Sequence, residues 1–197
     1  MKTLKISSMK SLLIISFIIL LLTNACAQSG NNTKPDASTN TKSVVAKPKI
    51  NIHMAVLSGN LEVVKQHIEA GTNINEKEAM SGSTPLISAA SFGKNDIAKA
   101  LIDAGADLSI KNNDGATSLH TAAFFCRVEI VQMLIDAKAD KTIRNNFGVT
   151  PRESVMGSFA EIKPIYEMLQ LQLEPIGLQI DLNEIEKTRP VITMMLQ

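Results

Sequence analysis

Short motifs recur along this chain at a fixed spacing of 33 residues. The stretch 82–86 (GSTPL) is followed by 115–119 (GATSL) and then by 148–152 (GVTPR). A period of this length is typical of a solenoid, in which each unit buries its apolar face only against its neighbours. The chain is therefore expected to fold as a stack of similar units.

Two helical patterns follow the turn in each unit. Thr84 is suited to cap the first helix, and Pro85 fits its first turn, where a missing N–H group is no loss. The alanine pair at 89–90 allows close packing against neighbouring helices. Apolar residues at helical spacing predict a second helix, and Gly105 supplies a left-handed stop after it. This second pattern recurs 33 residues later: Ile97, Ala98, Leu101 and Ile102 correspond to Ile130, Val131, Leu134 and Ile135.

The combined pattern, Thr-Pro-Leu-x-x-Ala-Ala, a short break, an apolar helix and Gly-Ala-Asp, resembles the ankyrin repeat. The resemblance implies an all-α solenoid of about four helix–turn–helix units with β-hairpin loops, over residues 50–171. In the fourth unit, Ile165, Met168 and Leu169 are interpreted as the second helix.

Residues 172–197 are apolar at mixed spacing. We expect them to form a C-terminal capping segment, because the end of a solenoid must shield its apolar face. The alternative is that residues 191–196, with Met194 and Met195, dock onto a partner.

Residues 1–27 have the features of a bacterial export signal. Three lysines precede an apolar run at 11–22, and small residues follow at 25–27. In one interpretation the signal is of the lipoprotein type, and Cys26 is lipidated and contacts the membrane. In the other, a soluble protein is released by cleavage before Gln28.

Residues 28–49 are rich in Gln, Ser, Asn, Thr and Lys and contain almost nothing to bury, which predicts a disordered polar linker. The expected location is therefore a membrane-anchored lipoprotein that faces the periplasm or the cell surface. The alternative is a soluble periplasmic protein.

The basic residues are concentrated before the repeats. From Ile50 onward the chain has 13 Lys and Arg against 18 Asp and Glu, a net charge of about −5. An acidic domain without tryptophan and without a basic stripe argues against nucleic acid as a partner.

The sequence contains no pattern typical of a catalytic, cofactor or metal site. Its three histidines, His53, His67 and His120, lie on different repeat elements, whereas zinc needs three or four converging ligands. The resemblance implies structural roles for His53 and His120, which hydrogen-bond the turn and the neighbouring unit. We therefore expect a protein that is not an enzyme and needs no cofactor.

Cys126 stands where the first two units have Gly59 and Gly93. It is interpreted as a tolerated substitution that strains a turn suited to glycine. The alternative is a reactive thiol.

In the ankyrin family, partners are held by hairpin tips and by the exposed side of the first helices. Matching positions before each turn glycine are Asn113 with Asp114 and Asn146 with Phe147. After the alanine pairs, the matching positions hold the other candidates: Phe92, Phe124 and Phe125.

The hypothesis is that Phe124 and Phe147 form the centre of a protein-binding face, flanked by polar residues that include Lys111 and Arg144. Core packing is the alternative for Phe92 and Phe125.

The expected function is non-catalytic binding of another protein in the bacterial cell envelope. The alternative is an inhibitor or immunity protein that blocks an extracytoplasmic toxin or enzyme. In both cases the acidic domain favours a basic target, through electrostatic steering.

Overall fold

The computed structural model describes residues 46–197. The predicted export signal, the predicted lipidation site Cys26 and most of the predicted linker at 28–49 lie outside these residues. Within the described part, no helix is both long enough and apolar enough to cross a bilayer.

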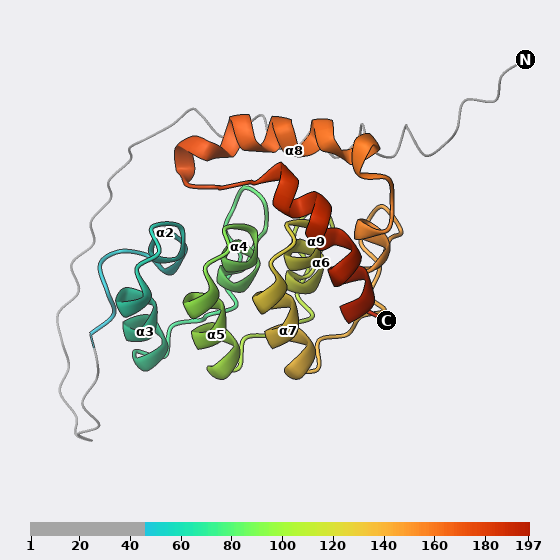
Figure 1. Cartoon of the computed structure of the whole chain (residues 1–197). Coiled ribbons are helices and arrows are strands. Elements are labelled where there is room, and N and C mark those ends of the chain that lie inside the picture. The colour runs from blue at the N-terminus through green and yellow to red at the C-terminus, as the bar shows by residue number, and fades with distance from the viewer. Residues whose placement is uncertain (1–45) are drawn as a thin grey trace, which may run out of the picture.

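Three helix–turn–helix units stand side by side (Figure 1). Their helices are α2 (Ile52–Leu57) with α3 (Leu61–Glu69), α4 (Pro85–Ser91) with α5 (Asn95–Asp103), and α6 (Ser118–Phe124) with α7 (Val128–Asp136). First helices contact first helices, and second helices contact second helices. The predicted all-α solenoid is confirmed.

The loops between units are closed by turns, and no strand is present in residues 46–197. In the loop before α6, the N–H of Asn112 donates to the carbonyl of Ala116 at 2.9 Å. Neighbouring loops are also joined to each other, since Asn113 N–H donates to the Ser81 carbonyl at 2.8 Å. The expected hairpins thus exist as tight turns that are bonded from one unit to the next.

The start of each first helix is fixed by its cap, as the sequence predicts. The Thr84 hydroxyl accepts from the N–H of Ile87 at 3.3 Å, and Pro85 occupies the first turn. In the next unit Thr117 and His120 form a reciprocal capping box.

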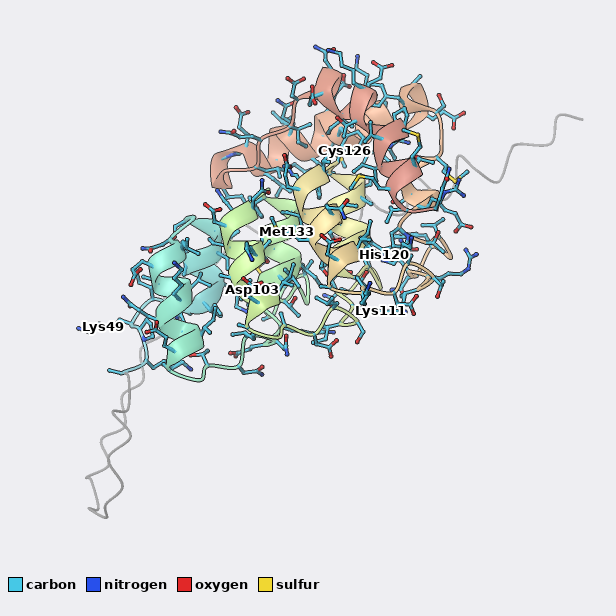
Figure 2. All side chains as sticks on the ribbon, turned by 60° about the horizontal axis from the view of Figure 1, so that its bottom comes forward. Lys49, Asp103, Lys111, His120, Cys126 and Met133 are labelled. Carbon is cyan, nitrogen blue, oxygen red and sulfur yellow. The ribbon has the colours of Figure 1, made fainter. Side chains whose placement is uncertain are left out.

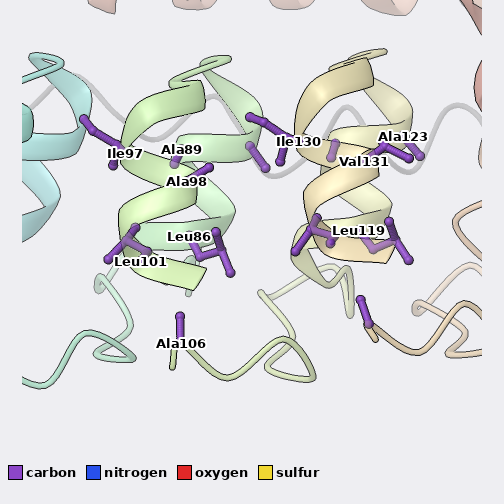
Figure 3. Close-up of a cluster of buried hydrophobic side chains, with 14 of the residues drawn as sticks. Leu86, Ala89, Ile97, Ala98, Leu101, Ala106, Leu119, Ala123, Ile130 and Val131 are labelled. Carbon is purple, nitrogen blue, oxygen red and sulfur yellow. The ribbon is translucent and has the colours of Figure 1, made fainter. Parts of the chain in front are cut away.

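The main core lies between the two layers of helices (Figure 3). Ala89 and Ala90 are completely buried, which permits the close approach of α4 to its neighbours. Leu101 and Leu134 are also completely buried, at equivalent positions of the second helices. Burying a leucine side chain contributes about 1.5–3 kcal/mol. Because these side chains are buried between neighbouring units, each unit is stabilised mainly by its neighbours.

The fourth unit differs from its prediction. Its first helix is reduced to the short 3-10 helix η2 (Glu153–Val155), and the helix that packs beside α7 and η2 is α9 (Leu182–Met195). The larger Val155 and Met156 stand where α4 has its alanine pair, and Met156 is exposed. Close packing of a full first helix is therefore prevented.

Between these two elements the chain inserts α8 (Phe159–Leu173) and the 3-10 helix η3 (Glu174–Ile176). Helix α8 crosses above the repeats instead of joining their row (Figure 1). Ile165 and Leu169 belong to a second cluster, together with Tyr166 and residues that follow η3. The prediction that Ile165, Met168 and Leu169 form the second helix of the fourth unit was wrong.

The C-terminal helix covers the end of the stack. Ile192 and Leu196 of this region are buried in the main core. Met194 is exposed, whereas Met195 packs partly against the core. Residues 191–196 thus use their buried side chains to cap the repeats.

Candidate binding groove

A groove of about 1400 Å³ runs along the inner side of the first helices. Its walls come from α2, α4 and α6, from the tips of the three inter-unit loops, and from α8 with η3. The insertion α8 therefore adds a wall that the repeats alone do not provide.

Helix α8 is attached to the repeats through aromatic residues. The rings of Tyr166 and Phe124 lie 4.8 Å apart, and the Tyr166 hydroxyl donates to the Phe124 carbonyl at 2.5 Å. Arg189, which is buried, donates to the same hydroxyl at 3.3 Å and to the Gly157 carbonyl at 2.9 Å. Burial raises the pKa of Tyr166, which keeps this hydroxyl protonated.

The three phenylalanines predicted near the first helices, Phe92, Phe124 and Phe125, all line the groove. All three also pack against a cluster of buried residues from α8 and the segment after it: Ile165, Tyr166, Leu169, Leu178, Ile180 and Ile185. Phe124 and Phe125 are in edge-to-face contact, with ring centroids 5.1 Å apart. Phe92 joins them from the preceding unit, and each of the three is half-buried. The alternative of core packing for Phe92 and Phe125 thus describes part of their surface, which packs against the cluster of α8 and residues 178–185.

At the loop tips, residues 33 apart form two rows with different roles. One row comprises Met80, Asn113 and Asn146: the Asn113 amide donates to the Met80 carbonyl, and the Asn146 amide to the Asn113 carbonyl, both at 2.9 Å. The other row comprises Ser81, Asp114 and Phe147, and all three of its members line the groove.

The predicted partner-binding residues at the loop tips fall into two groups. Asp114 and Phe147 line the groove, whereas Asn113 and Asn146 use their amides to join neighbouring loops. Lys111 and Arg144 are exposed and also lie outside the groove lining. Lys111 Nζ donates to the Arg144 carbonyl at 3.0 Å, and Arg144 pairs with a carboxylate of the fourth unit, Glu153, at 2.6 Å.

Exposed apolar side chains in the groove were missed by sequence reasoning. Met54 on α2, Met80 at the first loop tip and Ile176 in η3 are about half exposed and line the groove. A signal existed for Met80, because its loop is one residue longer than the next one. Ile176 gave no such signal, since its position depends on how α8 folds back.

The carboxylates of the groove lie in different surroundings. Burial raises the pKa of Asp114, whose side chain receives no hydrogen bond from any residue in 46–197. Glu78 is also desolvated by burial, but its pKa is lowered because Ser81 and the backbone N–H groups of Met80, Ser81 and Ser83 donate to it. Glu78 therefore stabilises its own loop, whereas the Asp114 carboxylate is not engaged within the described residues.

The three histidines also differ in their hydrogen bonds. His120 Nε2 is bonded to the Val149 carbonyl at 3.1 Å and Nδ1 to the Thr117 hydroxyl at 2.9 Å, which confirms its structural role. His67 is buried between the Ile50 carbonyl and the Thr72 hydroxyl. Within residues 46–197 both ring nitrogens of His53 are buried and have no partner in hydrogen-bond geometry, so the expected hydrogen bonds of His53 are not formed. The backbone of Glu76 and the carboxylates of Glu76 and Glu78 lie near the His53 ring and oppose the lowering of its pKa by burial.

Cys126 adopts the left-handed backbone conformation that its position predicts, with φ of 52°. Its thiol lies close to the carbonyl of Ile185 in α9, at 3.8 Å, and burial raises its pKa to about 11. Figure 2 shows Cys126 near the C-terminal helices and Lys111 at the opposite, loop end of the repeats. The thiol is thus a packing group and is largely protonated at neutral pH.

A metal ion in the groove would need several ligating side chains grouped together. Within residues 46–197 no three His, Cys, Asp or Glu side chains are grouped so that they could hold a metal ion. The groove combines apolar side chains, aromatic rings and charged groups of both signs on a stack of helices.

Such a stack of helical hairpins with a continuous inner groove defines the class of repeat scaffolds, which bind through an extended surface. Residues 52–145 match the family model of ankyrin repeats, with three copies. This part of the chain belongs to the ankyrin repeat family, whose repeats are protein–protein interaction modules.

Individual relatives share parts of this region. The human protein phosphatase 1 regulatory subunit 27 is 48% identical over 64 residues, which cover 32% of this chain and 41% of that protein. The human DNA-binding protein RFXANK is 36% identical over 58 residues, which cover 29% of this chain and 22% of that protein. The chain thus spans less than half of the length of these curated relatives.

Among solved structures, the ankyrin repeat domain of Bcl-3, a member of the IkappaB protein family, is similar to this fold. Its TM-score is 0.52 at 26% sequence identity, and the match covers 58% of this chain and 50% of that chain. The described repeats therefore have the architecture of a known ankyrin repeat domain.

Proposed function

We propose that this chain is a non-catalytic module that binds another protein of the bacterial cell envelope in the groove between the first helices, the loop tips and α8. The observation that carries the proposal is the exposure of large apolar side chains inside the groove: 53% for Met54, 45% for Met80 and 49% for Ile176. Apolar side chains gathered in one concavity are typical of a surface that a partner covers.

The location in the envelope rests on the sequence of residues 1–27. Lipidation of Cys26 would anchor the chain to a membrane, and the polar linker at 28–49 would hold the repeats away from it. About 22 residues of flexible chain span on the order of 25 Å. Recovery of the protein only in a soluble periplasmic fraction would remove the anchor and leave the binding function in place.

The binding function is tested by site-specific photo-crosslinking in cells that make the protein. A photo-reactive phenylalanine analogue replaces Met54 or Met80 in the groove, and in a control it replaces Glu129, which is exposed on α7 outside the groove. We expect both groove positions to give the same discrete crosslinked protein, and the control to give none.

A second variant shows whether a crosslink reports the groove itself. Met54→Asp places a charge on the apolar wall and leaves the buried core of α2 unchanged, because Met54 is exposed. It should abolish the crosslink from position 80. Equal crosslinking from the groove and from α7 would contradict the proposed function.

A further inference from the structure

The loop tips of the second and third inter-unit loops bring a carboxylate and an aromatic ring together. The N–H of Asn146 donates to the carbonyl of Asp114 at 2.9 Å, so Phe147, the next residue, stands on the tip adjacent to Asp114. The side chains of Asp114 and Phe147 both line the groove. Both are also half-buried, so water reaches each of them only in part.

Two basic side chains of these loops have other partners. Lys111 donates to a backbone carbonyl of the next loop, and Arg144 pairs with Glu153. The ion pairs within residues 46–197 are Arg144–Glu153, Lys99–Asp103 and Lys163–Glu167, and none includes Asp114. Within residues 46–197 the Asp114 carboxylate is thus partly desolvated and belongs to no ion pair, which is costly unless a ligand supplies a counter-charge.

The surroundings of Asp114 identify the kind of group that fits. An aromatic ring attracts a cation over its face and also packs against the aliphatic stem of a long side chain. A carboxylate beside the ring adds a charge-assisted hydrogen bond to an ammonium or guanidinium group. Lysine and arginine side chains meet both requirements, whereas acidic and short polar side chains meet neither.

We propose that the groove holds a polypeptide segment of the partner by placing one lysine or arginine side chain between Asp114 and Phe147, while apolar side chains of that segment contact Met54 and Met80. This inference rests on the proposed function and names the chemistry of the segment that the groove selects. The net charge of about −5 on residues 50–197 acts in the same direction, because it attracts a basic partner.

The test selects binding peptides from a random library of twelve-residue peptides displayed on phage, with the purified full chain as the target. We expect the selected peptides to be enriched in Lys or Arg with apolar neighbours. Asp114→Asn keeps the shape of the side chain and should lower the affinity of a selected peptide roughly 10-fold or more, because it removes the charge. Phe147→Ala should lower the affinity in the same direction.

The matched control is Asp103→Asn. Asp103 is an exposed carboxylate on α5 outside the groove, and its replacement makes the same change in net charge. Its affinity for the peptide should equal that of the unmodified chain. A peptide in which citrulline replaces the selected arginine provides a second measurement that needs no change in the protein, and it should bind as weakly as the selected peptide binds Asp114→Asn.

Three outcomes would overturn the proposal in distinguishable ways. Selected peptides that lack basic residues, or that bind Asp114→Asn unchanged, would remove the cation site and leave groove binding intact. A concentration-dependent dimer that Asp114→Asn dissociates would show that the occupant is a second copy of this chain. Peptides whose binding ignores both Met54→Asp and Asp114→Asn would remove the proposed function as well.

Discussion

The hydroxyl of Tyr166 donates a 2.5 Å hydrogen bond to the carbonyl oxygen of Phe124, and this bond fastens α8 to the last turn of α6. The same hydroxyl accepts from the buried guanidinium of Arg189 in α9. One phenol group therefore joins the inserted helix, the third unit and the C-terminal cap.

Tyr166→Phe should destabilise the fold by about 1–3 kcal/mol, because it leaves buried polar groups of Phe124 and Arg189 without a partner. Urea unfolding followed by circular dichroism measures this change. Lys163→Ala, on the exposed side of the same helix, is the control and should change stability by less than about 0.5 kcal/mol. A Tyr166→Phe variant as stable as this control would show that the hydroxyl does not hold α8.

Two glycines with the same backbone conformation should respond differently to alanine. Gly115 and Gly148 have φ of 72° and 73°, but a Cβ at Gly115 would collide with Asn146, whereas a Cβ at Gly148 meets no atom within 4 Å. Gly148→Ala should cost about 1–2 kcal/mol from backbone strain alone. Gly115→Ala should cost more and weaken the bonds between the loops, as measured by urea unfolding and by amide hydrogen exchange at Asn146. Equal losses of stability in the two variants would show that the close approach of Gly115 to Asn146 has no effect on stability.

Stability should fall as the pH is lowered from 7.5 to 5.5. Burial lowers the pKa of both His53 and His120 below 6.5, so the folded state binds fewer protons than the unfolded state. Their contribution is complete above pH 6.5 and is lost as the pH falls from 6.5 towards the folded pKa values. Urea midpoints at the two pH values check this, and His53→Gln should reduce the difference. A higher midpoint at pH 5.5 would contradict the assignment.

The thiol of Cys126 should react slowly in the folded protein. With its pKa raised to about 11 from 9.0, the thiolate fraction at pH 8 is roughly 100-fold smaller than in the unfolded chain. A chromogenic disulfide reagent measures the rate before and after urea is added, and Cys126→Ser identifies the signal. Rapid modification of the native protein would favour the alternative of a reactive thiol.

The three complete units were predictable because their determinants are local. Thr84, Pro85 and the alanine pair at 89–90 define a first helix wherever they recur, and Gly105 ends the second one. His120 was assigned correctly for the same reason, since its partners include Thr117 within its own capping box.

The end of the stack was not predictable in this way. Ile165 and Leu169 have the spacing of a second helix, and so do Ile185 and Ile192. Which of the two segments packs beside α7 is decided by competition between tertiary contacts, and periodicity does not report it. Phe124 and Phe147 line the same groove because the repeats set their positions. The wall beside Phe124 comes from α8, which the sequence analysis had assigned to the fourth unit.

The cluster that α8 forms with residues 178–185 is packed against Phe92 of the second unit and Phe125 of the third unit. Helix α8 follows η2 in the chain, and η3 and α9 follow α8. Both of its ends are therefore connected to the elements that end the stack. An extra unit inserted between these two would move Phe92 out of reach of a helix of fixed length. The contacts of this cluster therefore fit the present number of repeats, whereas an open solenoid can lengthen freely.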